Sequence, residues 1–194
     1  MFSLGTSVAL AWAVDMKSSK GFTLIELLIV VAIIGIIASI AVPGLLRARM
    51  SGNEASAIGS MRAINSSQHA YSSSCANGFY AGAFTDLQAP TAGGAPFLSP
   101  DLLVAAPTKS GYDFTMVIGT DGAPGTLDAC NGVTSAQLVS TYVARATPVS
   151  PGSSGVRFFW TSTLGTISFD PAAIIAHTLG HTPPTLTAPA GPLQ

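Results

Sequence analysis

The feature that most constrains this chain is the apolar run "FTLIELLIVVAIIGIIASIAV", residues 22–42. As an α-helix these residues would span roughly 31 Å, about the thickness of the hydrocarbon core of a bilayer. The run is apolar on every side, and a chain of 194 residues is too small to wrap such a helix in its own core. We therefore expect a transmembrane helix with one charged side chain, Glu26, inside it.

The basic residues around this run predict its orientation. Lys17 and Lys20 directly precede it, and the next basic residues, Arg47 and Arg49, follow it at a distance. Because basic residues favour the cytoplasmic side, we expect a single-pass protein with a cytoplasmic N-terminus and an exported remainder.

The start of the chain and its cysteines leave alternatives open. Residues 1–15 lack a basic region and make a poor secretory signal, so we favour Met16 as the start of translation, with Met1 as the alternative. Both cysteines, Cys75 and Cys130, lie on the side expected to be exported, where disulfides persist. A bridge between them, which we favour over two separate buried thiols, would stabilise the fold by about 4 kcal/mol.

A second, amphipathic helical pattern covers residues 43–74. Residues recur at alternating steps of four and three, namely Met50, Glu54, Ala57, Met61, Ile64, Gln68 and Tyr71. The stripe is only half apolar, so it predicts a lightly packed seam that continues into a globular domain and ends near Ser74.

Short β-like runs follow over residues 75–182. We expect a strand at 112–118, a second strand at 137–146, and a hairpin of "VRFFW" and "GTISF" turning near Gly165. Residues 88–100 are typical of a loop, and the Pro-rich tail 183–194 of disorder. The predicted fold class is α+β, with a long N-terminal helix whose second half carries a small antiparallel sheet.

The sequence "KGFTLIELLIVVAIIGIIASIAVP" closely resembles the N-terminal segment of type IV pilins and of the related pseudopilins of type II secretion. The positions that match the pattern of this family are Gly21, Phe22, Thr23, Leu24, Glu26, Gly35 and Pro43. The resemblance implies that residues 1–21 form a leader, that a prepilin peptidase cleaves between Gly21 and Phe22, and that the new amine of Phe22 is methylated. It also implies a pilin-like fold and an inner-membrane precursor.

The same resemblance implies partners and assembly residues. The partners are copies of the chain and other pilins in a helical filament, the peptidase, an inner-membrane assembly platform, and lipid before assembly. Thr23, Leu24, Gly35 and Pro43 would act with Glu26 in assembly, and the section between Gly35 and Pro43 would loosen in the filament.

Glu26 needs a reason to be inside a membrane segment, because a charge there costs about 2.5–3.5 kcal/mol by insertion scales. It is either an acid that reaches the headgroups without further role, or the partner of the amine that cleavage creates on Phe22. Between subunits such a pair would fix the axial register of neighbouring helices, since removing one partner of a buried pair costs ~3–5 kcal/mol.

Other functions find little support. The pair Asp121 and Asp128 lacks the spacing of a calcium loop, and the pair His177 and His181 lacks the acid of a zinc protease motif. We expect no metal, no cofactor and no enzymatic activity. From Cys75 onward three basic residues face six acidic ones, a net of −3, so direct binding of nucleic acid is not expected.

Within the structural class, two interpretations stay open. A surface pilus subunit is favoured because the chain lacks an acidic C-terminal calcium loop, and a pseudopilin of a type II secretion system is the alternative. A minor pilin for DNA uptake or adhesion is more remote.

Overall fold

The structure, a computed structural model, describes residues 21–88, 93–118, 123–171 and 191–193. Residues 1–20 of the expected leader, with Lys17 and Lys20, lie outside these residues, as do Asp121, His177, His181 and most of the Pro-rich tail. The chain divides into two compact units, Met1–Val42 and Pro43–Gln194. We describe each unit by itself.

One helix, α1 (Leu24–Ser74), runs from the first unit into the second, with Pro43 inside it. It ends where the serine-rich sequence predicts, directly before Cys75. The last turn of α1 is closed by the amide of Cys75, which donates to the Tyr71 carbonyl over 2.9 Å. The amides of Ala76 and Gly78 also bond back to carbonyls of the last turn, so the helix end is satisfied by the chain that follows it.

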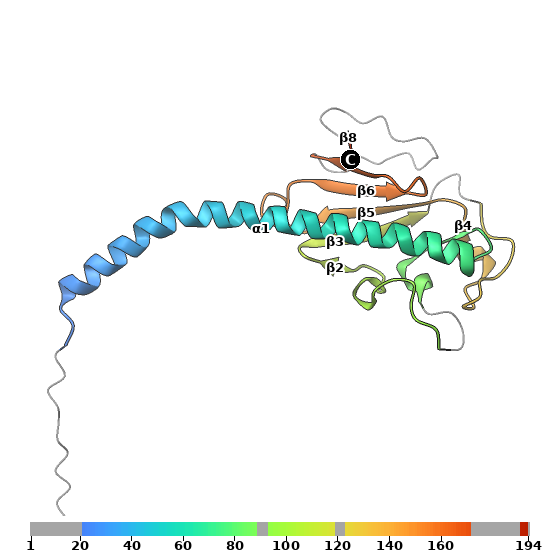
Figure 1. The fold of residues 1–194 in the computed structure, drawn as a ribbon, viewed down its shortest axis with the longest axis horizontal. Helices are drawn as coiled ribbons and strands as arrows, with labels where there is room; N and C mark the ends of the chain where they lie inside the picture. The colour runs from blue at the N-terminus through green and yellow to red at the C-terminus, as the bar shows by residue number, and fades with distance from the viewer. Residues whose placement is uncertain (1–20, 89–92, 119–122, 172–190, 194) are drawn as a thin grey trace, which may run out of the picture. The chain divides into compact units, whose positions relative to one another are not determined.

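The second unit places the later half of α1 against an antiparallel sheet (Figure 1). The six-stranded sheet has the order β2-β3-β5-β6-β7-β8, and a two-stranded sheet pairs β1 with β4. The strands of the larger sheet are β2 (Thr108–Lys109), β3 (Tyr112–Ile118), β5 (Tyr142–Pro148), β6 (Phe158–Ser162), β7 (Ile167–Asp170) and β8 (Gly191–Pro192). The smaller sheet consists of β1 (Tyr80–Ala81) and β4 (Leu138–Val139), and three short 3-10 helices are η1 (Phe84–Leu87), η2 (Pro100–Leu102) and η3 (Ser135–Gln137).

The core lies between α1 and the larger sheet. The helical stripe predicted from the sequence faces it, but the stripe is part of a dense core and not a lightly packed seam, because Ala57, Met61, Ile64 and Tyr71 are at most 1% exposed. The central strand β5 presents the small side chains of Ala144 and Ala146 to this core, flanked by Phe114 of β3 and Phe159 of β6. Small residues on the central strand leave room for the large side chains of the helix.

Two polar side chains in the same stripe of α1, Asn65 and Gln68, are buried and form hydrogen bonds with the β region. Gln68 behaves like a strand residue, because its amide donates to the Ala81 carbonyl over 3.0 Å and accepts from the Ala81 amide over 2.9 Å. Asn65 bonds three separate groups of the sheet, the Thr161 hydroxyl, the Gly165 carbonyl and the Tyr142 hydroxyl. Each buried amide therefore fixes the position of α1 along the sheet.

Two sequence predictions about the β region are wrong in part. Residues 137–146 do not form one strand, since β4 and β5 belong to different sheets. Between them, Ser140 leaves the ladder and exchanges two hydrogen bonds with Ala123 through its amide and its hydroxyl. In the tail, the described residues 191–193 are ordered, with β8 on the edge of β7 and the Leu193 amide donating to the Ile167 carbonyl. The strand at 112–118 and the hairpin of β6 and β7 are confirmed.

Glu54 anchors the start of β6 to α1. One carboxylate oxygen, Oε1, accepts from the amides of Val156 and Arg157 over 2.9 and 3.2 Å. The other, Oε2, accepts from Nε and Nη2 of Arg157 over 2.7 and 2.6 Å. Burial by itself raises the pKa of the Glu54 carboxyl, but these hydrogen bonds outweigh burial and hold the pKa below its ordinary value.

We predict that Glu54→Gln lowers the free energy of unfolding of the full chain in detergent micelles by roughly 2–3 kcal/mol at neutral pH, because charged hydrogen bonds are lost. A carboxylate with a lowered pKa stabilises the fold above its ordinary value near 4.5, and this stability is lost as the pH falls through the lowered pKa. The difference between variant and wild type should therefore shrink in acid. Denaturation followed by near-ultraviolet circular dichroism measures both.

The matched control is Asp101→Asn, which removes the exposed ion pair of Asp101 with Lys109. Exposed pairs contribute less than about 1 kcal/mol, so this variant should unfold almost like wild type. Equal effects of the two substitutions, or a Glu54→Gln effect independent of pH, would contradict the role assigned to Glu54.

Candidate functional site

The N-terminal end of α1 is closed by a reciprocal hydrogen-bonded cap between Thr23 and Glu26. The Thr23 amide and hydroxyl both donate to Oε2 of Glu26, over 2.9 and 2.7 Å. The Glu26 amide in turn donates to the Thr23 hydroxyl over 3.3 Å. This is a capping box, in which a residue before the helix and the third helical residue satisfy each other's free amides.

The capping box was not foreseen from the sequence, although the signal is present there. A Thr followed three residues later by Glu, directly ahead of an apolar run, is the usual signature. The sequence analysis explained the charge of Glu26 but did not predict this local role. The structure therefore gives Glu26 a partner within its own chain, and only Oε2 is used: in the described part of the chain Oε1 accepts no hydrogen bond.

The apolar surface beyond the cap is exposed all around. Every large apolar side chain from Phe22 to Val42 is 51–90% exposed in the single chain. Among the described residues, α1 is the one helix long and apolar enough to cross a membrane by length and composition. A continuous apolar surface of this size marks a contact with lipid or with other proteins.

The glycines and the proline expected to act in processing and assembly lie in this exposed part of the chain. Gly21 and Phe22 precede the first residue of α1, and Phe22 is 90% exposed. A Cβ atom built on Gly21 or Gly35 would meet no heavy atom within 4 Å, so no contact within the chain requires a glycine there. Leu24 is the first residue of α1, and Pro43 is exposed.

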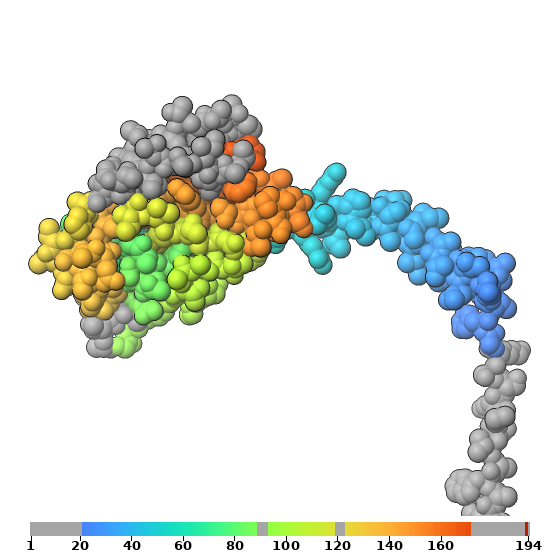
Figure 2. Space-filling view, turned by 180° about the vertical axis from the view of Figure 1, so that it is seen from behind, coloured from blue at the N-terminus to red at the C-terminus, as the bar shows by residue number. Residues whose placement is uncertain are grey.

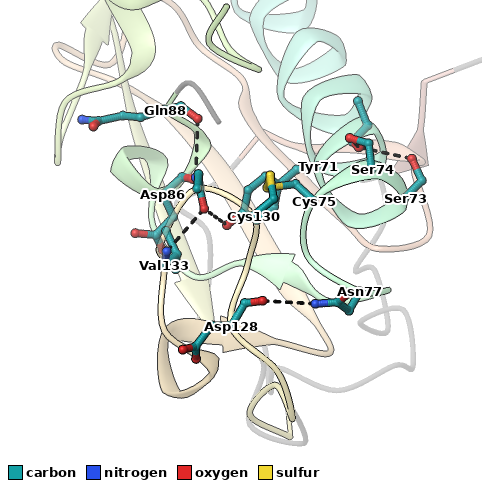
Figure 3. Close-up of a disulfide and its surroundings, with 12 residues drawn as sticks. Tyr71, Ser73, Ser74, Cys75, Asn77, Asp86, Gln88, Asp128, Cys130 and Val133 are labelled. Atoms are coloured by element: carbon teal, nitrogen blue, oxygen red, sulfur yellow. Dashed lines mark hydrogen bonds between the residues drawn. A yellow bond between two sulfur atoms is a disulfide. The ribbon is translucent and has the colours of Figure 1, made fainter. Parts of the chain in front are cut away.

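The far end of α1 is joined to a loop by the disulfide between Cys75 and Cys130 (Figure 3). This confirms the predicted bridge over the alternative of two separate thiols. The Cys130 amide also donates to the Cys75 carbonyl over 2.9 Å, and the Asn77 side chain donates to the Asp128 carbonyl over 3.2 Å. The bridge thus lies within a local network and is not the only link between the two segments.

Asn131, next to the bridge, holds a third segment in place. Its amide nitrogen donates to the Asp86 carbonyl over 2.8 Å, and its oxygen accepts from the Tyr71 hydroxyl over 3.1 Å. Burial raises the pKa of Tyr71 to about 12, although the bond with Asn131 acts in the opposite direction. The hydroxyl therefore stays protonated and donates throughout the physiological range. Sequence reasoning missed Asn131, which carries no motif.

Of the candidate metal ligands, Asp128 lies within the described residues and has a structural role. Asp128, considered for calcium, accepts a hydrogen bond from the Ser135 amide over 2.7 Å and so shapes its own loop. Within residues 21–88, 93–118, 123–171 and 191–193, no group of three His, Cys, Asp or Glu residues lies close enough to hold a metal ion.

Comparison with known proteins places the N-terminal segment in a defined class. Residues 16–42 match the family model described as the prokaryotic N-terminal methylation motif. The chain is similar to the type IV wide pilus major component PilA4 of Thermus thermophilus, with 59% identity over 39 residues, which are 20% of this chain and 30% of that protein. It is also 79% identical over 28 residues to a fimbrial protein of Pseudomonas aeruginosa, covering 14% of this chain and 18% of that protein. The search of solved structures gave no significant match.

The fold and the N-terminal segment together define a pilin-like α+β protein with a prokaryotic N-terminal methylation motif. Over that segment the chain is homologous to type IV pilins, which are structural proteins and not enzymes. The matched segment spans at most 30% of the length of these relatives.

We predict that replacing both Cys75 and Cys130 by serine lowers the free energy of unfolding by about 4 kcal/mol, because the bridge closes a loop over a sequence separation of 55 residues. The Asn131 and Asn77 contacts should keep the native fold at low temperature. Thermal melts of the full chain in detergent, with and without reductant, measure the effect. Wild type in reductant should match the variant, and a variant as stable as the oxidised wild type would contradict the prediction.

Proposed function

We propose that this protein is a structural subunit of a type IV pilus-like filament. The observation that carries the proposal is the apolar segment from Phe22 to Val42, which is exposed on every side and contains one acid, Glu26, in the first turn of α1. Such a surface is stable in lipid or against identical helices, but not in water. The similarity to a wide pilus major component and to fimbrial proteins supports the same conclusion.

In this proposal the chain is first a precursor in the bacterial inner membrane, with its N-terminus in the cytoplasm. A prepilin peptidase cleaves between Gly21 and Phe22 and methylates the new amine of Phe22. Both residues lie ahead of α1 and are exposed, so a protease can reach the bond without unwinding the helix. Methylation of an amine keeps its positive charge, so the charge of Phe22 is available to Glu26 afterwards.

The processed subunits then polymerise through their N-terminal helices, with help from an inner-membrane assembly platform. Each helix exchanges lipid for the apolar surface of its neighbours, and the paired charges of Glu26 and a neighbouring Phe22 set the axial offset. Gly35 and Pro43 bound a section of low intrinsic helix stability that can extend in the filament. No direct contact with nucleic acid is part of this function.

A pseudopilin of a type II secretion system is the rival. Electron microscopy of an intact strain and a deletion strain separates the two. Loss of surface filaments on deletion supports the pilus subunit, whereas intact filaments with failed protein release would support the pseudopilin.

We predict that coexpression with a prepilin peptidase yields a mature chain that begins at Phe22 and is heavier by one methyl group than the unmodified peptide. Mass spectrometry of the N-terminal peptide measures both. Gly21→Ala should block cleavage, whereas Gly35→Ala, a glycine inside the helix, should not. Cleavage at another bond, or equal processing of both variants, would contradict the assignment.

We predict that Glu26→Ala leaves insertion and cleavage intact but abolishes or sharply reduces filaments, because it removes both the cap and the charge. Glu26→Gln separates these two roles, since glutamine at this position also completes a capping box but carries no charge. If the charge sets the register, the glutamine variant fails as well. Filament yield in sheared surface fractions, checked by electron microscopy, is the measurement.

The matched control for this pair is Thr23→Val, which removes the hydroxyl of the cap and keeps the acid. It should assemble far better than Glu26→Gln. Abundant normal filaments from Glu26→Ala, or from Glu26→Gln, would refute the role of the charge.

A further inference from the structure

Two basic side chains follow the apolar segment closely. Arg47 and Arg49 lie five and seven residues past Val42, so chain length alone keeps them within roughly 18 and 25 Å of it. Both side chains are exposed. In the described part of the chain neither takes part in an ion pair or a side-chain hydrogen bond.

A loop of the second unit lies beside this part of α1. The connection between β5 and β6, residues 149–157, contacts the helix where the Asn53 amide donates to the Ser154 carbonyl over 2.8 Å and where Glu54 accepts from Val156. Figure 1 shows this connection beside α1, and Figure 2 shows the same orange region against the helix from behind. Asn53 is only four residues from Arg49, about 6 Å along the helix axis.

This end of the second unit exposes apolar side chains beside Arg47 and Arg49. The loop contains no charged residue from Val149 to Val156, and these two valines are 51% and 53% exposed. The helix adds Leu45 and Leu46, which are 56% and 42% exposed. Exposed valine and leucine beside free arginine are typical of a surface that rests at a membrane interface.

The nearby acids do not cancel the two arginines. Glu54 is bound by Arg157, and Asp101 forms an ion pair with Lys109. Asp113 is the third acid at this end, and its carboxylate accepts from the Thr108 hydroxyl over 2.5 Å. Asp170, buried at the end of β7 opposite Phe158, is a fourth acid at this end, so the acids equal the four basic residues in number. The two arginines that lack an ion-pair partner among the described residues are the two nearest the apolar segment.

We propose that this end of the second unit, formed by residues 45–49 and the β5–β6 loop, docks on the outer headgroup layer of the same bilayer that holds residues 22–42. Arg47 and Arg49 bind phosphate groups of anionic lipids, because a guanidinium presents paired donors to phosphate oxygens. Val149 and Val156 rest among the headgroups. The inference depends on the proposed function, since it requires the apolar segment to be in a membrane before assembly.

Two arguments favour lipid over a second copy of the chain as the binding partner of this surface. One is the charge of the two arginines, and the other is their distance from the apolar segment. Arg47 and Arg49, which form no ion pair among the described residues, would repel the same arginines of a second copy, whereas anionic headgroups attract them. Because the chain between Val42 and Arg49 is short, headgroups stay within reach of the arginines in every orientation of the unit.

The test uses the full chain, reconstituted in vesicles of phosphatidylcholine alone or in equal parts with phosphatidylglycerol. A polarity-sensitive fluorophore on Ser153→Cys reports from the loop, and the same fluorophore on Leu164→Cys reports from the β6–β7 turn. The carbonyl of Gly165 in that turn is bonded to Asn65, roughly 24 Å along α1 from Arg49. The native cysteines are bridged, so the introduced thiol is free for labelling.

We expect a blue-shifted emission and quenching by spin-labelled lipid for Ser153→Cys in the anionic vesicles, and no response for Leu164→Cys. The double substitution Arg47→Gln and Arg49→Gln should abolish the response. The matched substitution Arg62→Gln should leave it unchanged, since Arg62 is another exposed arginine that forms no ion pair within the described residues.

Three results would overturn the docking. They are a loop label that does not respond to anionic lipid, equal behaviour of the double variant and Arg62→Gln, and a response that vanishes on dilution of protein in lipid, which would indicate contact between copies. Alkaline extraction of the same vesicles separates this failure from that of the proposed function. Wild-type protein that is extracted would refute the membrane anchor itself, and retained protein with an unresponsive label would refute the docking alone.

Discussion

The rest of the structure depends on the polar contacts that α1 makes where it is buried. The two parts of α1 differ in their surface. Up to Val42 the helix is apolar on every side, and in its later half the face that meets the sheet is only half apolar. Buried polar groups are costly unless bonded, and the second half of α1 bonds each of the large ones to a specific strand or loop. Glu54 anchors the start of β6, Asn65 the β6–β7 turn, and Gln68 the edge strand β1.

These contacts give the globular unit a register that apolar packing alone would leave loose. Leucine and methionine tolerate small shifts along a helix, but a carboxylate with two backbone amides and a guanidinium around it does not. Glu54 and Gln68 lie fourteen residues apart, about 21 Å along the axis, so they hold α1 at two separate points. The disulfide of Cys75 adds a covalent point just beyond them. The later half of α1 is therefore held to the rest of the second unit at three separate points.

The sequence predicts much of this fold because its strongest patterns are long. Periodicity over residues 50–71 marks the buried helical face, and alternation over 112–118 marks β3.

Three features of the structure could not be predicted from the sequence. The break at Ser140 depends on a partner, Ala123, that is distant in sequence. The burial of Glu54 and Gln68 depends on which strand groups lie opposite, so a half-polar stripe looks looser than it is. Asn131 carries no motif at all. The Thr23–Glu26 cap was readable from spacing alone and was missed because the charge of Glu26 already had an explanation.

Glu26 can close the cap and also pair with the amine of a neighbouring Phe22, because the two roles use different oxygens of its carboxylate. Both hydrogen bonds from Thr23 go to Oε2 of Glu26, and Oε1 accepts none in the described part of the chain. A carboxylate can accept about four hydrogen bonds, so an amine from a neighbouring subunit can approach Oε1 while the cap stays closed. The cap then does more than end the helix. It also orients the carboxylate through two hydrogen bonds near the helix N-terminus, where the free amides already favour a negative charge. In the proposed filament, an acid held in this way would present Oε1 to the amine of a neighbouring Phe22 in one direction, which is what selection of an axial register requires.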